Sequence, residues 1–580
     1  MIYLILTYFL ISLICFWAGL VFYAIVPASS SNKQNPLNKP LIIYIITGLI
    51  FVTLLGQLIV LFFPLNLYFT LLVLLFLLIA SFLIKENILM HFRKAWEGLG
   101  KQPAFFFLCL AAFLFTILSL NAGPTVMDDT DSYHIQMIKW AQEYGTVPGI
   151  ANLHLRFGFN SSWFISIGLL SPRFDGINSY LSLNGLLSLW ICYYLLEKFF
   201  SFSMDRPPSK NMLFAMLVIL ALCLINWPMI RGNATNSNYD FITTFCILVL
   251  FFESRFSFKA LLTTEFILWP CYMFTIRMIN YPLLLLSVYG MVMLYKSDKI
   301  KPVIIYALIA SFIIVPFLIR NTILSGYPFF PIYQLDFFHF DWKADRQKMI
   351  EISEYIKYFN RVTPVYQPLD ITSRLNFPEW IIPWYKSLFR FDRVITTLSL
   401  LCYLILFIRQ KKILAGVAPH IKFFLCVMVL QLVSWFFTAP DPRFVYGPLL
   451  IAIFILVYSI PLSVVRISSS LMKSISVCLS ACMIGYTANK IIINTNYRNW
   501  ITPRHLPVPA ITKVIIGKIE LNIPGKVLNN WNPRCYDITL PCLYRVDPRL
   551  EARGKNIKYG FRLADSSSTR FPGGEYKIEP

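Results

Sequence analysis

The sequence predicts an all-α polytopic membrane protein with about fourteen transmembrane helices and a small outer C-terminal domain. Of its 580 residues, 57% are hydrophobic and only 14% are charged, and the mean hydropathy is +0.63. This composition is typical of membrane proteins, in which apolar stretches of about 17–25 residues cross the hydrocarbon core.

The apolar runs define the expected membrane helices one by one. They lie at 2–26, 41–63, 66–84, 104–121, 176–197, 211–228, 240–254, 260–276, 281–295, 303–319, 391–408, 423–438, 447–465 and 471–488. The first run has no basic segment before it and no small-residue cleavage site, so we interpret it as a retained helix rather than a signal peptide.

The basic residues alternate between successive connections, and this alternation predicts the orientation, because cytoplasmic loops carry the excess of Lys and Arg. The expected inner connections contain Lys33, Lys39, Lys85, Arg93, Lys94, Lys101, Lys198, Arg206, Lys210, Arg255, Lys259, Lys296, Lys299, Lys301, Arg409, Lys411, Lys412, Lys422, Arg466 and Lys473. The alternate short connections hold only Arg231, Arg277 and Arg443. We therefore expect the N-terminus, the segment 320–390 and the tail from 489 on the outer side of the cell inner (plasma) membrane.

Three regions follow from this pattern. Residues 1–103 contribute three N-terminal transmembrane helices, residues 104–488 form the main membrane domain with outer loops 122–175 and 320–390, and residues 489–580 form a periplasmic or extracellular C-terminal domain. The net charge of +22 comes mostly from the inner connections and the basic tail, so we expect no nucleic-acid partner.

Two of the 12 cysteines, Cys535 and Cys542, lie in the tail rather than in an apolar helix. An oxidising outer compartment favours a disulfide between them, and two thiols alone are a poor metal site.

The stretch "MDDTDSYHIQMIKWAQEYG" at 127–145 places a cluster of carboxylates directly after the apolar run 104–121. Carboxylates beside a bilayer are costly, so the cluster either faces water as a loop or carries chemistry. The residues after it suggest an amphipathic helix in the membrane interface, with Tyr133, Met137, Trp140, Ala141 and Tyr144 on one face. Thr130 or Asp131 would cap its N-terminus, and His134 is either a packing residue or a site residue.

An acidic residue in the first large outer loop of a multi-helix protein, ahead of an interfacial helix, resembles the C-type glycosyltransferase superfamily. More closely, several segments resemble a poorly characterised bacterial family of multi-pass membrane proteins related by pattern to those enzymes. The segments are "DTDSYHIQMIKWAQEYGTVPGIANLHLRFGFNSSWF" (129–164), "RNTILSGYPFFP" (320–331), "APDPRFVYG" (439–447), "CYDITLPC" (535–542) and "RGKNIKYGF" (553–561).

The resemblance implies a C-type glycosyltransferase-like fold and transfer of a sugar from a polyprenyl phosphate donor on the outer face. The family pattern of an Asp–Thr pair five residues ahead of a His matches Asp129, Thr130 and His134, which favours Asp129 over Asp128 as the catalytic residue. The acidic loop follows the fourth helix here rather than the first, and three additional N-terminal helices account for this departure.

The outer connections also supply candidate substrate-binding residues. A lipid phosphate leaving group needs a cation, and the guanidinium fork suits it. Arg156, Arg277, Arg320 and Arg443 are therefore candidates, together with His134. Their simpler interpretations are an interfacial anchor for Arg277, a partner for a loop carboxylate for Arg320, and a pair with Asp441 for Arg443. Aromatic residues in 320–390 are interpreted as interface anchors.

The function predicted from these observations is an inverting membrane glycosyltransferase. Its partners would be a polyprenyl phosphate sugar donor, the lipid bilayer, and an envelope glycan, lipid or protein acceptor. No cofactor is expected, although a divalent metal held by Asp128, Asp129 and Asp131 is an alternative to catalysis by Asp129 alone. The alternative functions are an envelope polysaccharide polymerase or ligase, and a flippase or transporter of lipid-linked sugars.

Overall fold

The structure is a computed structural model of the whole chain, and the part of it that can be described covers thirteen segments. These are residues 1–26, 39–99, 102–171, 179–204, 210–256, 263–298, 300–359, 361, 376–415, 417–460, 469–499, 506–526 and 533–564. Several expected inner-side residues, namely Lys33, Lys101, Arg206, Lys259, Lys299 and Arg466, lie outside the described segments, as do the expected helix limits at 176, 260 and 465.

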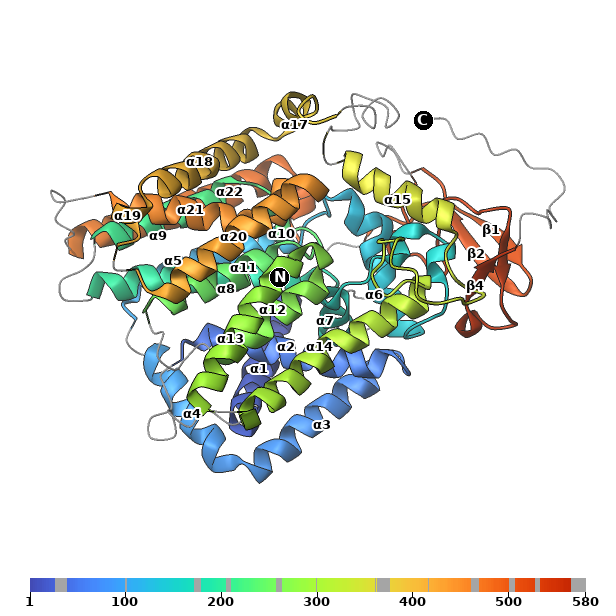
Figure 1. Cartoon of the computed structure of the whole chain (residues 1–580), viewed down its shortest axis with the longest axis horizontal. Coiled ribbons are helices and arrows are strands. Elements are labelled where there is room, and N and C mark those ends of the chain that lie inside the picture. The colour runs from blue at the N-terminus through green and yellow to red at the C-terminus, as the bar shows by residue number, and fades with distance from the viewer. Residues whose placement is uncertain are drawn as a thin grey trace.

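Helices dominate the described chain, and a helix lies at each of the expected apolar runs (Figure 1). The helices at these runs are α1 Ile2–Ile25, α2 Leu41–Val60, α3 Leu67–Leu83, α5 Ala104–Asn121, α8 Ser182–Met204, α9 Lys210–Ile225, α11 Phe241–Phe256, α12 Thr263–Ile276, α13 Leu284–Asp298, α14 Ile300–Ser325, α18 Arg390–Ile408, α20 Pro419–Thr438, α21 Tyr446–Ser459 and α22 Ser469–Ile493. The other α-helices are α4 Lys85–Leu99, α6 Ile135–Glu143, α7 Ser162–Leu170, α10 Ile230–Asn233, α15 Arg346–Phe359, α17 Ile381–Ser387 and α19 Gln410–Ile413.

Eight helices within the described segments are long and apolar enough to cross a membrane. They are Ile2–Ile25, Leu41–Val60, Ala104–Asn121, Met278–Ser297, Ile300–Ser325, Arg390–Ile408, Pro419–Thr438 and Leu471–Ile493. A further span results if α3 and the start of α4 count together, but these helices meet at a bend of 96°. The coarser prediction of a helical membrane protein is thus confirmed, whereas the count of fourteen spans stays a prediction.

Close helix contact at one glycine pair sets the packing of the N-terminal helices. A Cβ atom on Gly48 of α2 would lie 1.7 Å from the Cys15 carbonyl oxygen, and one on Gly19 of α1 would lie 2.0 Å from that of Tyr44. Small residues let membrane helices approach backbone to backbone in this way. The two helices therefore depend on glycine at both positions.

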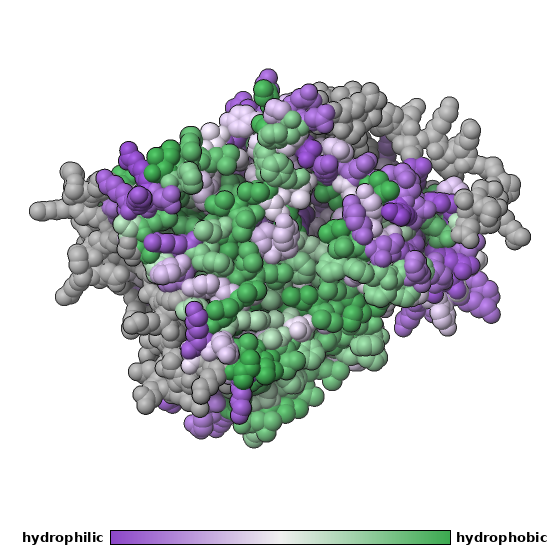
Figure 2. All heavy atoms as spheres, viewed as in Figure 1, coloured by the Kyte–Doolittle hydropathy of each residue, from purple (hydrophilic) through white to green (hydrophobic). Residues whose placement is uncertain are grey.

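The polar parts of the molecule separate to opposite ends of the helix bundle. In Figure 1 the strands of the tail lie at the right with α6 and α15, while α19 lies at the left. Figure 2 shows hydrophobic residues across α13, α14 and α20 between these ends, and hydrophilic residues gathered over the tail strands. We call the end that carries the tail strands, α6 and α15 the tail end.

The described tail forms two small antiparallel hairpins joined to the bundle. Strands β1 Ile511–Ile516 and β2 Ile519–Pro524 pair from Ile511 with Pro524 to Ile516 with Ile519, and β3 Leu550–Ala552 pairs with β4 Phe561–Leu563. Gly560, at φ +86°, lets β4 approach the bundle, since a Cβ atom there would lie 2.0 Å from the Pro148 carbonyl oxygen. The structure also joins Cys535 and Cys542 in a disulfide.

Two expectations about local structure are wrong. Helix α14 continues to Ser325, so Arg320 lies inside a helix instead of opening an outer segment. The helix after the acidic cluster already begins at Asp128, so neither Thr130 nor Asp131 caps it. That helix is buried on every side, since every residue from Thr130 to Gln142 is buried; its position in the membrane interface stays a prediction.

The basic-residue pattern predicts which end of the bundle faces the cytoplasm. We expect an introduced cysteine at Lys412, exposed on α19, to react with a membrane-impermeant maleimide only after cells are permeabilised. A cysteine at Lys558, exposed in the tail, should react in intact cells. The chain without an introduced cysteine is the control, and the reverse labelling pattern would contradict the orientation.

Candidate functional site

Hydrogen bonds with the connection that precedes α11 hold the start of the acidic segment's helix in place. The Asn236 side-chain oxygen accepts hydrogen bonds from the backbone N–H groups of Val126 (3.2 Å) and Met127 (2.8 Å). The Thr130 hydroxyl accepts one from the backbone of Ser237 at 3.2 Å. Residues Thr130–His134 then form one π-helical turn before α6 begins. Such turns are rare and are frequently found at functional sites.

Asp129 lies between two arginines from distant parts of the chain. Its carboxylate is 3.0 Å from Arg156 Nη1 and 3.9 Å from Arg443 Nη1, and its side chain keeps 27% of its surface exposed. Burial alone would raise the pKa of Asp129, but Arg443 and Arg156 outweigh that effect and hold the pKa below its usual range. Asp129 is therefore an ionised carboxylate that a molecule at the tail end can reach.

Arg443 continues the network to two more carboxylates. Its Nε atom is 2.9 Å from Asp441 and 3.7 Å from Asp240. Arg277 binds the other oxygen of Asp240 at 2.8 Å and donates to the Tyr239 hydroxyl at 3.1 Å. Burial raises the pKa of Asp240 even though Arg277 and Arg443 oppose it.

Three arginines and three aspartates thus alternate in one network, and their formal charges cancel. The network joins the acidic segment to the residues that precede α11, follow α12 and precede α21. Because each of these arginines already has a carboxylate, an anion can bind one of them only by displacing it.

The other two carboxylates of the cluster turn toward the tail. Arg534 Nε is 2.6 Å from Asp128, and Arg534 Nη1 is 3.6 Å from Asp131. Only 3% of the Asp131 side chain is exposed, and the Thr125 hydroxyl donates to it at 2.9 Å. Burial raises the pKa of Asp131 to about 7, because Thr125 and Arg534 compensate only in part.

The tail also covers the polar face of α6. The Lys139 ammonium donates to the backbone carbonyls of Asp537 (2.9 Å) and Ile538 (2.5 Å) and pairs with the Asp537 carboxylate at 3.0 Å. Gln136 donates to the carbonyls of Tyr536 and Ile538 at 2.9 and 3.2 Å. Residues of the disulfide loop thus supply the partners that a buried lysine requires.

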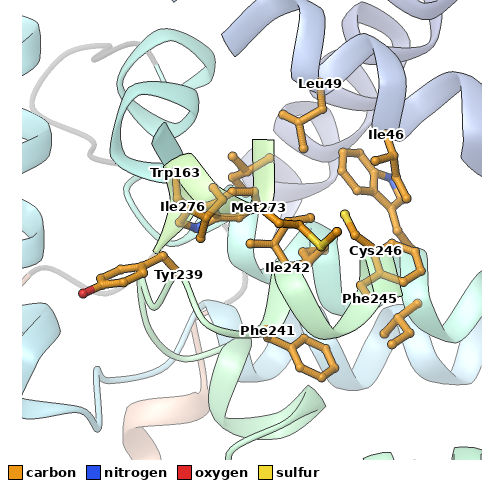
Figure 3. Packing of buried hydrophobic residues seen from close by; sticks show 14 of the residues in the cluster. Ile46, Leu49, Trp163, Tyr239, Phe241, Ile242, Phe245, Cys246, Met273 and Ile276 are labelled. Carbon is orange, nitrogen blue, oxygen red and sulfur yellow. The ribbon is translucent and has the colours of Figure 1, made fainter. Parts of the chain in front are cut away.

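Aromatic side chains pack beneath the charged residues, around His134. His134 packs between the rings of Tyr133, Phe164 and Tyr239, at centroid distances of 4.4, 5.1 and 5.3 Å. Burial lowers the pKa of His134 to about 3, so the ring is neutral. Figure 3 shows Tyr239 at the edge of the hydrophobic cluster, with its hydroxyl directed away from the other labelled side chains. The hydrophobic core thereby carries a site residue on its surface.

Helix α15 lies beside the site. Its Tyr355 interacts with Arg156, and Tyr544 of the tail shares a 2.6 Å hydrogen bond with His154. Ion pairs join the tail to this part of the chain, with Arg549 at 3.3 Å from Asp345 and Arg553 at 2.8 Å from Asp341. The segment after α14 and the tail therefore form one cover.

The structure brings most of the expected site residues together. Asp128, Asp129, Arg156, Arg277 and Arg443 belong to one charged group, and His134 lies beneath it. Arg320 is apart from them, inside α14, where its Nη1 donates to Asn160. Arg443 does pair with Asp441, its simpler interpretation. Arg277 has a carboxylate partner instead of being a simple interfacial anchor, and Arg320 contacts an amide instead of a loop carboxylate.

Sequence reasoning missed Asp240, Arg534 and the three tyrosines Tyr239, Tyr355 and Tyr544. Asp240 ends the polar run "NATNSNYD" directly before an apolar helix, the same setting that drew attention to Asp129. Arg534 adjoins Cys535, but no pattern in the sequence connects it to residues four hundred positions earlier.

A metal held by the acidic cluster receives no support from the geometry. Within the described segments, no group of three or more His, Cys, Asp or Glu side chains is arranged to hold an ion. Asp129 faces Arg156, whereas Asp131 faces Thr125 and Arg534.

The fold and this charged end together define a helical membrane protein with an ion-pair network under a polar cover. Residues 1–450 match the family described as "Domain of unknown function (DUF8201)", and the chain belongs to that family. The match includes the first three helices and ends before the tail. No curated protein and no solved structure gives a significant match to the chain.

The buried lysine predicts strong coupling between α6 and the tail. Lys139→Met should lower the free energy of unfolding by about 3 kcal/mol, since it leaves buried acceptors without their cation. Limited proteolysis should then release the tail faster. Lys513→Met is the matched control, because Lys513 and its partner Glu520 are exposed by 63% and 49%. Equal protease resistance of the two variants would contradict the coupling.

The raised pKa of Asp131 predicts a specific pH dependence. The folded protein holds this proton more tightly than the unfolded chain does, so stability is lost as the pH rises from about 4 to about 7. Asp131→Asn cannot ionise and should escape the loss, which amounts to at most about 4 kcal/mol. We expect its Tm relative to the wild type to increase between about pH 5 and about pH 8.

Asp547→Asn provides a contrast of opposite sign. Burial would raise the pKa of Asp547, but hydrogen bonds from Lys348 and the Arg549 backbone hold it below its usual range. Its stabilising effect is therefore present above the unfolded pKa of about 4, and the variant should be less stable than the wild type at neutral pH. If the Tm difference from the wild type changes with pH in the same direction in both variants, the pKa directions given for Asp131 and Asp547 are contradicted.

Proposed function

We propose that this protein is an inverting glycosyltransferase that moves a sugar from a polyprenyl phosphate donor to an envelope acceptor. The observation that carries the proposal is the Asp129 carboxylate, which is ionised, reachable from the tail end, and held between Arg156 and Arg443. The protein would act in the cell inner membrane, with the tail end on the outer side.

The reaction needs few parts. Asp129 takes the proton of the acceptor hydroxyl while that oxygen attacks the anomeric carbon of the sugar. The bond between this carbon and the phosphate oxygen breaks, and the phosphate leaves with the electron pair. Since the attack comes from the face opposite the leaving group, the anomeric configuration is inverted. Negative charge builds on the phosphate, so a cation beside it lowers the barrier.

Asp129 is preferred as the base over Asp131, although the Asp131 pKa of about 7 lies nearer the working pH. A base must first reach the proton that it removes, and only then does its pKa matter. The Asp131 side chain is 3% exposed, against 27% for Asp129 and 46% for Asp128. Asp131 instead fixes the position of the segment through Thr125 and Arg534.

A polymerase or ligase of envelope polysaccharide is the second candidate function. The arginines Arg156, Arg277 and Arg443 at the tail end favour it, because such an enzyme would depend on cations more than on an acidic base. The two functions differ in their response to loss of Asp129. The glycosyltransferase depends on Asp129 as its base, whereas the polymerase or ligase depends on the arginines.

The proposal predicts that Asp129→Asn lowers the rate of sugar transfer by about a hundredfold to ten-thousandfold, because the substitution keeps the size of the side chain but removes the base. Asp128→Asn should have an intermediate effect, since Asp128 only holds Arg534. The measurement is mass spectrometry of envelope glycans from cells that lack the gene and express each variant.

Glu520→Gln, at an exposed position of strand β2 in the tail, is the control and should leave the glycan profile unchanged. If Asp129→Asn also leaves it unchanged while Arg443→Gln abolishes the product, the polymerase or ligase is the better proposal. Equal loss in Asp128, Asp129 and Asp131 variants that added divalent cation restores would indicate a metal site.

A further inference from the structure

Arg320 is a buried cation near the outer end of a membrane-spanning helix. It lies in α14, one turn before the helix ends at Ser325, and its exposed fraction is 1%. Its Nη1 atom donates to the side-chain oxygen of Asn160. Asn160 in turn donates to the backbone carbonyl of Phe317, at 3.3 Å, which holds the amide against α14.

The rest of the guanidinium has no partner. Both Nε and Nη2 of Arg320 are buried and form no hydrogen bond to any residue that the structure describes. These two nitrogens share one edge of the planar group, and their N–H bonds are parallel. That edge is the one that binds two oxygens of a carboxylate or phosphate at once.

The other arginines at this end differ in having carboxylates already. Arg156 pairs with Asp129, Arg277 with Asp240 and Arg443 with Asp441, while Arg534 pairs with Asp128. Among described residues, no carboxylate lies within ion-pair distance of Arg320. An incoming anion would displace a partner at the other sites but not at this one.

An unpaired buried charge is unfavourable, and an apolar side chain of similar volume would be more stable in its place. The unfavourable charge is explained if it serves to bind an anion. The same helix favours an anion that is carried by a lipid, because α14 exposes an apolar stripe of Ile304, Leu308, Phe312, Val315 and Ile319, each between 44% and 55% exposed. This stripe leads along the lipid-facing side of α14 to the residue next to Arg320.

We propose that Arg320 binds the phosphate of the lipid substrate side-on through Nε and Nη2, while Asn160 holds Nη1. This inference rests on the proposed function and assigns its phosphate to Arg320 rather than to Arg277 or Arg443. Arg320 and Asp129 are held by the same short stretch of chain, since Asn160 follows Arg156, the partner of Asp129, by four residues, and the backbones of these two residues are at most about 14 Å apart.

The test measures binding to the full-length protein in nanodiscs of zwitterionic lipid. The probes are a polyprenyl phosphate, the corresponding polyprenol without phosphate, and inorganic phosphate, each followed by native mass spectrometry and by Tm. We expect the wild type to bind the polyprenyl phosphate at least tenfold more tightly than the other two probes. Equal binding of inorganic phosphate would overturn the assignment to a lipid, and equal binding of the polyprenol would overturn the role of the phosphate.

The decisive variant is Arg320→Met. We expect its affinity for the polyprenyl phosphate to fall at least tenfold, while its Tm without ligand equals or exceeds that of the wild type. Arg320→Lys should fall between the two, since it keeps the charge and loses the two-point contact. Arg498→Gln, which removes an arginine that donates to backbone carbonyls elsewhere on the surface, is the matched control. Affinity of Arg320→Met within twofold of the wild type would overturn the inference.

Two further results separate this inference from the proposed function. Asp129→Asn should bind the polyprenyl phosphate as the wild type does, because the base does not contact the phosphate. If Asp129→Asn remains active while Arg320→Met loses binding, the proposed function fails and the phosphate site stands. If the wild type does not bind the polyprenyl phosphate, both fail.

A measurement on the wild type alone covers the case in which Arg320 variants do not fold. A photoactivatable polyprenyl phosphate, with the reactive group beside the phosphate, should crosslink to residues 156–162 and 317–324. Crosslinks confined to the neighbourhoods of Arg277 and Arg443 would overturn the inference.

Discussion

The Arg443 guanidinium faces three carboxylates that come from three separate parts of the chain. Asp129, Asp240 and Asp441 lie within 3.9 Å of it, and each belongs to a different connection between helices. In a low-dielectric setting such charges are stable only as a paired set. The pairing therefore fixes the relative positions of the helix ends, and the positions of Tyr239, Arg156 and α15 follow from it.

The neutrality of this network has a consequence for chemistry. The carboxylates that hold the arginines in place also lower the positive potential that a phosphate would meet. A protein that binds an anionic lipid beside such a network needs a cation that the carboxylates have not neutralised. Arg320, held by an amide rather than by an acid, is such a cation, whereas Asp129 is paired with Arg156 and Arg443.

The sequence predicted the helices well because each apolar run is constrained by its own length and composition. Asp129, Arg277 and Arg443 were also predictable, since a charge at the end of an apolar run is visible in one dimension. The residues that pair with them could not be predicted. Arg534 pairs with Asp128 although about four hundred residues separate them in the sequence, and Asp240 was only the first residue of the expected helix 240–254. The burial of α6 was missed for a similar reason, because Gln136 and Lys139 have the pattern of a solvated face until the tail provides their acceptors.

The cover over α6 also affects how the chain is made. Lys139 and the Asp537 carbonyl that accepts its hydrogen bond are 398 residues apart, so at a synthesis rate of about 5–20 residues per second the partner follows by roughly 20–80 s. During that interval the lysine and its helix lack the contacts that permit burial. The acidic segment can settle only when residues 534–538 have been synthesised, which makes synthesis of the tail a condition for forming the site.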